Sequence, residues 1–449
     1  MARAEEKWRH EGRFWVPGES ARTSGWLDYT PERGVTVHLF ESPLPGSLWD
    51  PIRVDALHGE TLGGSPFSLL DGEVVGPTTI TPSSARTADI AFAALVEGGH
   101  VTTLDEVAGN LASVGLHDLR EFLRGGGFGT PLLNVSADRE CVAHCTVDFD
   151  WGSLQLLAAG VQTKWSRDET RTEVKAHAQL RFREEAALST VDAVIEPLRD
   201  LVSFSTGRAS YVTGLSLLTA GQAQAATPTS RGDFKVIRRP EADPQHVPRA
   251  RLPLLLNPAT VPQGIGILQS WFALRGQLGP VWPLFFSTIF DPWLPPESQL
   301  LNLTAFAEGY HRTLHDEPPL PKAEAAAAVA TMLEALPENR TRELFRPALS
   351  YANSQSQRAR IRWLTRRALA ALPAWQLDAR EFTSQIADTR NWHTHWGERG
   401  GGVQEGDDLL RLARRLYLVL SVNLLLDLGV ESADVAPQLE TRLQVTGLP

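Results

Sequence analysis

An arginine, an amide and two imidazoles lie within six residues near the C-terminal end of the chain: Arg390, Asn391, His393 and His395. Guanidinium binds phosphate oxygens through two parallel hydrogen bonds and stays charged. Imidazole titrates near neutral pH, so it can accept or donate a proton. RNA cleavage needs few further groups, because the ribose 2′-hydroxyl is itself a nucleophile. The residue types therefore favour phosphodiester chemistry at Arg390 and His395, although basic residues at a helix C-terminus also simply complement the helix dipole.

The spacing of this Arg-x4-His pattern limits how a helix can present it. The preceding segment predicts a helix over 378–395. On a regular helix, residues five positions apart point about 140° away from each other. Two alternatives follow: the helix is distorted at its end, beside Gly397 and the run 400–402, or a second copy of the chain completes the site. Asn391 and His395 are four apart and share a face, so Asn391 is expected to orient the imidazole or bind substrate.

The predicted secondary structure changes from strands to helices along the chain. Up to about residue 182, short apolar runs with frequent Gly and Pro predict strands, such as the alternating run 35–40. Ser189 and Thr190 are expected to cap a helix. From residue 264 onward the spacing is helical, which places the motif at the end of a penultimate helix. Helices are predicted over 265–278, 284–290, 299–315, 321–336, 340–351, 357–372, 378–395 and 406–428.

A length of 449 residues is sufficient for two or three domains, each with its own core. We expect an α+β multidomain chain with a β-rich N-terminal region followed by an all-α helical bundle. The predicted boundaries are 11–255 for the β-rich region, 256–297 for a helical connector and 298–432 for the bundle. An alternative divides the first region into two lobes, about 11–135 and 136–255.

Charge is distributed unevenly along the chain. The net charge of −10 argues against a protein that coats nucleic acid indiscriminately. The segment from residue 340 to residue 380, however, contains nine arginines and only two acidic residues, Glu343 and Asp378. This gives a local net charge of +7 just before the motif. An arginine-rich helix beside a phosphate site suits RNA binding, and a solvated helix face is the alternative. The candidate RNA contacts are Arg358, Arg362, Arg366 and Arg367.

Several classes of protein are excluded by composition and pattern. No apolar run approaches about 18 residues, so no membrane span is predicted. The charged start, 1–10, does not resemble a secretory signal, and two cysteines are too few for a disulfide framework. We therefore expect a cytoplasmic protein. Cys141, His144 and Cys145 have no second ligand cluster, so we expect neither a metal site nor another cofactor.

The motif and its neighbours together resemble the ApeA-type HEPN proteins of bacterial anti-phage defence. HEPN domains are helical bundles marked by Arg-x4-6-His, often with Asn after the Arg, and the match here is Arg390, Asn391 and His395. The segment 306–311 is similar to the family's opening helix, and 409–428 to its closing helix. The runs 12–17, 25–27, 59–70 and 97–100 are similar to the family's β-rich N-terminal domain. The resemblance covers nearly the whole chain.

The resemblance implies a metal-independent endoribonuclease that acts as a toxin and halts growth on infection. Its expected partners are an RNA substrate, with tRNA or another structured RNA as the target, a second copy bound through the HEPN domain, and a phage-derived trigger. We expect Arg390 and His395 to be catalytic, with Asn391 in support. His393 is a possible second imidazole, and Glu308 either fixes Arg390 or His395 or forms an ordinary ion pair.

Two other functions remain open at this stage. One is a non-catalytic HEPN dimer that binds RNA or a partner protein as a regulator. The other is a ligand sensor in which the β-rich region does the work and the bundle only dimerises. The complete Arg390, Asn391 and His395 set favours the nuclease, because a binding protein does not require all three groups.

Overall fold

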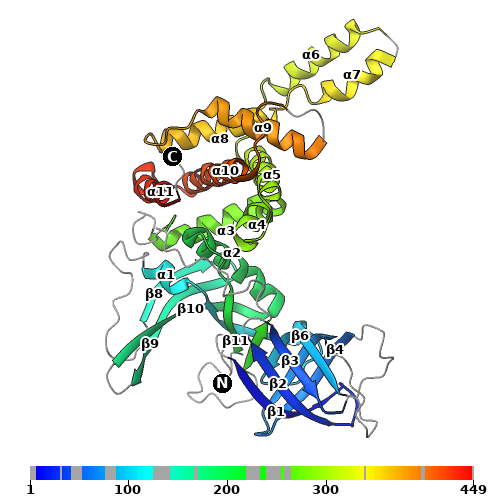
Figure 1. The fold of residues 1–449 in the computed structure, drawn as a ribbon, viewed down its shortest axis with the longest axis vertical. Coiled ribbons are helices and arrows are strands. Elements are labelled where there is room, and N and C mark those ends of the chain that lie inside the picture. The colour runs from blue at the N-terminus through cyan, green and yellow to red at the C-terminus, as the bar shows by residue number, and fades with distance from the viewer. Residues whose placement is uncertain are drawn as a thin grey trace. The chain divides into compact units, whose positions relative to one another are not determined.

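The chain divides into two compact units, Met1–Phe272 and Ala273–Pro449. The computed structural model (Figure 1) describes residues 7–30, 33–41, 53–75, 87–124, 142–165, 170–218, 233–238, 254–256, 264–337, 340–395 and 400–446. Strands dominate the first unit and helices make up the second. This confirms the predicted α+β class, a β-rich region followed by a helical one. Within the described residues, no helix is both long and apolar enough to span a membrane.

The first part of the N-terminal unit is a closed antiparallel β-barrel. Neighbouring strands in the order β3-β2-β1-β4-β5-β6 are hydrogen-bonded, and β3 closes the ring by pairing with β6. Alternating residues of β3, Val35, Val37 and Leu39, are fully buried and pack with Phe14 and Leu27, as a period of two predicts. The strands are β1 (Trp8–Trp15), β2 (Thr23–Thr30), β3 (Gly34–Leu39), β4 (Arg53–Thr61), β5 (Pro66–Val74) and β6 (Ala88–Glu97).

A second set of strands continues the sheet beyond β6. Strand β12 pairs with the end of β6, and the order from there is β12-β11-β7-β10-β9-β8. The sequence pattern fails to predict β11, because Gly214 interrupts it and only Leu215 and Leu217 are buried. The strands are β7 (Ala108–Leu116), β8 (Val142–Phe149), β9 (Gly152–Trp165), β10 (Thr170–Ala187), β11 (Val212–Leu218) and β12 (Phe234–Arg238). The side chains of Cys141, His144 and Cys145 lie outside the described residues.

Helix α2 (Leu188–Thr206) packs against β7 and β10, and the short α1 (Leu119–Arg124) packs beside it. The prediction that Ser189 and Thr190 cap α2 is wrong. The helix starts at Leu188 without a side-chain cap, because β10 leads directly into it at Ala187. Ser189 and Thr190 instead lie in its first turn.

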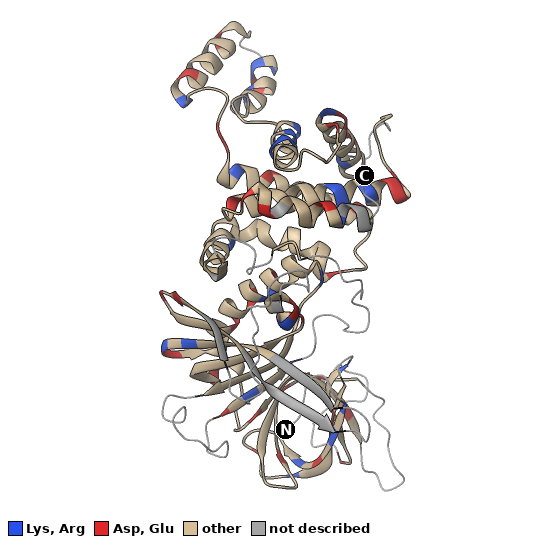
Figure 2. Ribbon diagram, turned by 90° about the vertical axis from the view of Figure 1, so that its left-hand side faces the viewer, with Lys and Arg blue, Asp and Glu red and all other residues tan. Residues whose placement is uncertain are grey.

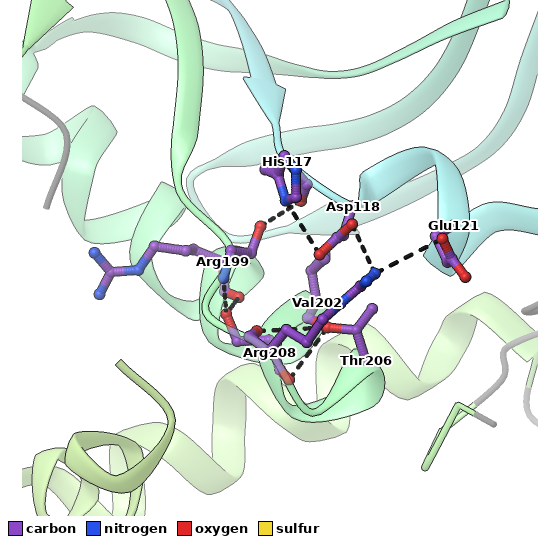
Figure 3. A network of polar contacts seen from close by, with 9 residues as sticks. His117, Asp118, Glu121, Arg199, Val202, Thr206 and Arg208 are labelled. Carbon is purple, nitrogen blue, oxygen red and sulfur yellow. Dashed lines mark hydrogen bonds and ion pairs between the residues drawn. The ribbon is translucent and has the colours of Figure 1, made fainter. Parts of the chain in front are cut away.

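Polar contacts tie the end of α2 to the turn that follows β7 (Figure 3). Arg208 donates a hydrogen bond to Asp118 at 2.8 Å, and Asp118 adopts a left-handed backbone with φ of 64°. The hydroxyl of Ser203 accepts the Ser210 N–H at 2.9 Å, and the hydroxyl of Ser210 donates to the His117 carbonyl at 2.5 Å. These bonds satisfy groups that the fold buries, so they stabilise the N-terminal unit.

The second unit contains the predicted helices at nearly their predicted positions, plus one more. The pattern fails to predict α11, since Pro437 lies inside it and interrupts the helical spacing. The motif helix α9 is therefore followed by two helices, and its predicted penultimate position is wrong. The helices are α3 (Ile267–Leu278, at the boundary of the units), α4 (Trp282–Phe290), α5 (Pro296–Leu314), α6 (Lys322–Ala335), α7 (Arg340–Ser350), α8 (Gln357–Ala371), α9 (Ala379–His395), α10 (Gly406–Asp427) and α11 (Ser432–Thr446).

A largely buried polar cluster joins α5, α8 and α10 near the end of α10. Asp427 accepts hydrogen bonds from the Tyr310 hydroxyl and, at 2.5 Å, from Arg367. The Nε2 of His315 lies 2.9 Å from the same carboxylate. Arg367 also donates to Asn423 at 3.3 Å. Three helices therefore converge on one carboxylate, which fixes their mutual positions.

Candidate active site

Helix α9 carries the motif and is continuous to His395. Its start is capped by Asp378, which accepts the N–H groups of Glu381 at 2.9 Å and Arg380 at 2.7 Å. These two hydrogen bonds lower the pKa of Asp378 below its ordinary value. Phe382 and Ile386 of this helix are buried in the bundle. The sequence therefore forms an amphipathic, capped helix whose last turn reaches solvent.

Arg390 and His395 are brought together at the end of α9. The guanidinium NH1 of Arg390 lies 3.4 Å from the His395 Nε2 and donates to the Asn391 side-chain oxygen at 3.2 Å. This contact forms within one chain on a helix that is continuous to His395, so the predicted distortion of the helix is not present in the described residues. The second alternative, a site completed by another copy of the chain, stays a prediction. The long Arg390 side chain spans the angular separation that the two Cα positions impose.

The charge at this site is uncompensated. Within the described part of the chain, Arg390 has no carboxylate partner. Arg390 is half-buried, whereas Asn391 and His395 are exposed. A half-buried guanidinium without a carboxylate, next to an exposed imidazole, can receive an anion such as a phosphodiester. Asn391 contacts the guanidinium of Arg390, and its predicted role of orienting the imidazole or binding substrate stays a prediction.

A latch made of one hydrogen bond and one close approach holds the loop after α9 against the helix. The buried hydroxyl of Thr389 accepts the Gln404 N–H at 3.0 Å. Asp388 accepts from Arg358 of α8 at 2.9 Å and from Ser384 at 3.2 Å. A Cβ on Gly402 would lie 2.5 Å from the Asp388 carboxylate, so a side chain at this position would require that carboxylate to move. The sequence reasoning missed these residues, because nothing in their spacing marks a loop that returns to its own helix.

We expect Thr389→Val to lower RNA cleavage about tenfold or more while leaving RNA affinity nearly unchanged. The substitution keeps the shape but leaves the Gln404 N–H unsatisfied, and small displacements of catalytic groups are costly. Single-turnover cleavage rates and RNA dissociation constants check this. Thr383→Val is the matched control, since among the described residues its buried hydroxyl bonds to the Ala379 carbonyl of the same helix and to no residue of the loop. Equal rates for the two variants would show that the latch does not position the site.

Within the described residues, neither auxiliary residue predicted from sequence forms a hydrogen bond or ion pair with Arg390 or His395. His393 is half-buried, and its Nε2 is shielded from solvent without a hydrogen-bond partner among the described residues. Glu308 of α5 accepts from Arg312 at 2.9 Å and from Gln357 at 3.4 Å. The geometry of Glu308 agrees with the ordinary ion pair that the sequence left open.

The four arginines predicted to contact RNA lie on two sides of α8. Arg358, Arg362 and Arg366 follow each other at intervals of four and share one face. Arg358 is 45% exposed even though it is paired with Asp388. Arg367 lies on the other side of α8, where its guanidinium donates hydrogen bonds to Asp427 and Asn423. Its charge is therefore paired with Asp427 inside the bundle. Figure 2 shows basic and acidic residues interspersed along the helices rather than one continuous basic face.

Comparison with known protein families gives two matches that together span most of both units. The model of ApeA N-terminal domain 1 matches residues 9–237, just over half of the chain. The model described as Apea-like HEPN matches residues 301–434, a range that contains α9 and the whole Arg390–His395 arrangement. Searches of curated proteins and of solved structures found no match.

Proposed function

We propose, from the premise that this chain belongs to the ApeA family and joins ApeA N-terminal domain 1 to an Apea-like HEPN domain, that it is a metal-independent endoribonuclease. HEPN domains are typical of ribonucleases of defence systems, and the proposal places the chemistry of this one at Arg390 and His395. The observation that carries it is the half-buried Arg390 guanidinium, which has no carboxylate partner among the described residues and lies 3.4 Å from His395.

The proposed reaction is transesterification at one phosphodiester. In one assignment His395 accepts the proton of the ribose 2′-hydroxyl, whose oxygen attacks phosphorus, and water protonates the departing 5′-oxygen. In the other, water takes the 2′-hydroxyl proton and protonated His395 donates to the departing 5′-oxygen. The bond between phosphorus and the 5′-oxygen breaks, which leaves a 2′,3′-cyclic phosphate and a 5′-hydroxyl. Arg390 neutralises the charge that builds on the phosphate oxygens, and Asn391 holds the guanidinium in place.

The wider assignment follows the same proposal. The β-rich region, 11–255, and a connector, 256–297, precede the catalytic bundle, 298–432. We propose that two copies associate through the HEPN domain, that tRNA or another structured RNA is the substrate, and that a phage-derived trigger releases the activity in the cytoplasm. Arg358, Arg362 and Arg366 are proposed to guide the RNA backbone, since they share a face of α8 that starts beside Asp388.

We expect the purified protein to cleave total tRNA in the presence of EDTA. No step of the proposed reaction requires a metal ion, so chelation is expected to change the rate less than about twofold. Denaturing gels give the cleavage, and treatment with a cyclic-phosphate-opening enzyme identifies the ends. Lysate from infected cells is included in parallel to supply a trigger. Products with 3′-hydroxyl ends, or cleavage that EDTA abolishes, would contradict the mechanism.

A further inference from the structure

Helix α8 presents a partly exposed tryptophan, Trp363, at the edge of its arginine face. Trp363 is 39% exposed and lies three positions before Arg366, a spacing that places the two side chains next to each other. The positions of α8 that flank Trp363 on its own side are Ala359 and Ala370, whose side chains are too short to cover an indole. A large aromatic side chain therefore remains open to solvent beside an exposed guanidinium.

Trp363 is held in place by a cluster of aromatic and basic side chains from the end of α5 and from α8. The ring centroid of His315 lies 4.7 Å from that of Trp363, with the two planes tilted by 33°. His311, which is fully buried, stands at 89° to the indole with its centroid 5.0 Å away, and the guanidinium carbon of Arg367 lies 5.6 Å from the indole centroid. His315 and Arg367 both contact the Asp427 carboxylate. The position of the indole is therefore fixed before a ligand binds, which lowers the entropy cost of binding.

The charges around Trp363 favour an anionic ligand. Helix α8 contains five arginines and no acidic residue. Within the part of the chain that the structure describes, neither Arg362 nor Arg366 has an ion-pair partner, and the Nε of Arg362 is buried without a hydrogen bond. Asp427, the carboxylate of the cluster, is already paired with Arg367. Two unpaired guanidinium groups beside an open indole suit a ligand that carries both a negative charge and an aromatic ring.

We propose that Trp363 stacks one unpaired base of the RNA substrate, while Arg362 and Arg366 bind the phosphates on either side of it. A nucleotide whose base is not paired offers an aromatic face to the indole and an anionic group to a guanidinium at the same time. Double-stranded RNA fits this surface less well, because its bases are covered by their neighbours in the stack. A protein partner would have to supply carboxylates as well as an apolar group. The subsite therefore selects unpaired RNA but not base identity, since every base has a face that can stack.

The subsite is connected to the candidate active site through Arg358. Trp363 lies five residues, about 7.5 Å, along α8 from Arg358, and Arg358 bonds to Asp388 at 2.9 Å. Asp388 precedes Arg390 by two residues in α9. One short unpaired segment can therefore reach both Trp363 and the phosphate proposed to bind at Arg390. The role of this RNA as a substrate rests on the proposed nuclease function, whereas the binding itself does not.

The test measures binding of the full-length chain to a short single strand of 2′-O-methyl RNA, which lacks the 2′-hydroxyl nucleophile and is not cleaved. Fluorescence anisotropy gives the dissociation constant. Trp363→Leu is expected to weaken binding at least about fivefold, because the stacked base loses its aromatic partner. Trp363→Phe keeps an aromatic ring and is expected to stay within about twofold of the wild type. Trp293→Leu is the matched control, since Trp293 is an exposed tryptophan of the same unit between α4 and α5. Unfolding curves verify the fold of each variant.

Several results would overturn the proposal. The first is a wild type that does not bind the single strand, and the second is a Trp363→Leu chain that binds it equally well. An equal loss of affinity for the same sequence in a duplex would also exclude stacking on an unpaired base. Unchanged RNA affinity in Trp363→Leu, together with lost protection of infected cells, would assign this surface to a protein partner. The oligonucleotide is not cleaved, so each result is independent of the tRNA cleavage assay that tests the nuclease.

The salt dependence of binding separates stacking from phosphate contacts. On a single strand, each phosphate contact adds about 0.7 to the slope of log affinity against log salt concentration. Arg366→Gln is expected to reduce the size of that slope by about 0.7, whereas Trp363→Leu is expected to lower affinity and leave the slope unchanged. Arg411→Gln is the control, since Arg411 of α10 is already paired with Asp408. A Trp363→Leu chain whose slope falls as much as that of Arg366→Gln would show that this surface binds RNA through charge alone, which would overturn the stacking.

Discussion

Arg390→Ala is expected to lower RNA cleavage by about 10²–10³-fold, because its guanidinium is the cation proposed to meet the charge of the transition state. The side chain has no carboxylate partner among the described residues, so its removal leaves no ion pair broken and the fold is expected to persist. Circular dichroism and unfolding curves verify the fold, and single-turnover cleavage of tRNA gives the rate.

His395→Ala is the companion variant, with an expected loss of about 10²–10⁴-fold when the proton transfer is removed. His393→Ala serves as the matched control, since it deletes an imidazole of the same helix whose Nε2 is shielded from solvent and has no partner among the described residues. RNA binding that survives in both Arg390→Ala and His395→Ala, with cleavage lost, supports the nuclease. Cleavage at the wild-type rate by His395→Ala would exclude this residue from the chemistry.

Assays of protection against phage infection and of RNA cleavage distinguish the nuclease from the two other functions, a ligand sensor in the β-rich region and a non-catalytic regulator. An Arg390→Ala chain that still protects cells normally would favour the β-rich region as the working part, with the bundle only dimerising. A wild type that binds RNA tightly but never cleaves it, with or without infected lysate, would favour the regulator. The first outcome is read from infected cells and the second from the purified protein, so the two assays test the site and the function independently.

Asp427→Asn is expected to destabilise the helical unit by about 3–5 kcal/mol, since removing one partner of a largely buried pair leaves the other charge unmatched. Asp427 is 13% exposed and Arg367 is 25% exposed, and Tyr310 and His315 depend on the same carboxylate. Chemical denaturation followed by helical circular dichroism gives the loss. Arg312→Ala is the control, because it breaks the exposed Arg312–Glu308 pair and is expected to cost less than about 1 kcal/mol.

The same carboxylate predicts how stability depends on pH. Burial raises the pKa of Asp427, but hydrogen bonds from His315, Arg367 and Tyr310 outweigh it and hold that pKa below its ordinary value. A carboxylate with a lowered folded-state pKa stabilises fully above its unfolded value and loses that contribution as pH falls through the folded one. The Asp427-dependent part of stability is therefore expected to begin to fall near about pH 4, the ordinary value of the unfolded chain, and to vanish only below the lowered pKa of the folded state. A difference between wild type and Asp427→Asn that stays constant down to pH 2 would contradict this assignment.

The local elements of this protein were predictable from sequence because their signals are local. Helix α9 follows from an acidic cap at Asp378 and an apolar stripe, and α10 ends before Gly429, whose φ of 80° suits glycine. The Arg390, Asn391 and His395 set is likewise contiguous. The sequence pattern therefore predicts helices α5 to α10 and the alternating strands of the barrel. It does not predict α11 and β11, because Pro437 and Gly214 interrupt their patterns.

Tertiary structure alone decided which groups meet. Nothing in the spacing of β3 and β6 says that they pair and close the barrel, since strand pairing across 50 residues is a non-local choice made by burial. Arg366 and Arg367 are adjacent in the sequence, but only Arg367 points toward α10. The packing of α8 against α10 pairs its guanidinium with Asp427. The contact of Arg390 with His395 depends on a flexible side chain, and the return of Gly402 to Asp388 depends on a loop. Sequence thus determined which residues stand at the end of α9, and packing determined how they face one another.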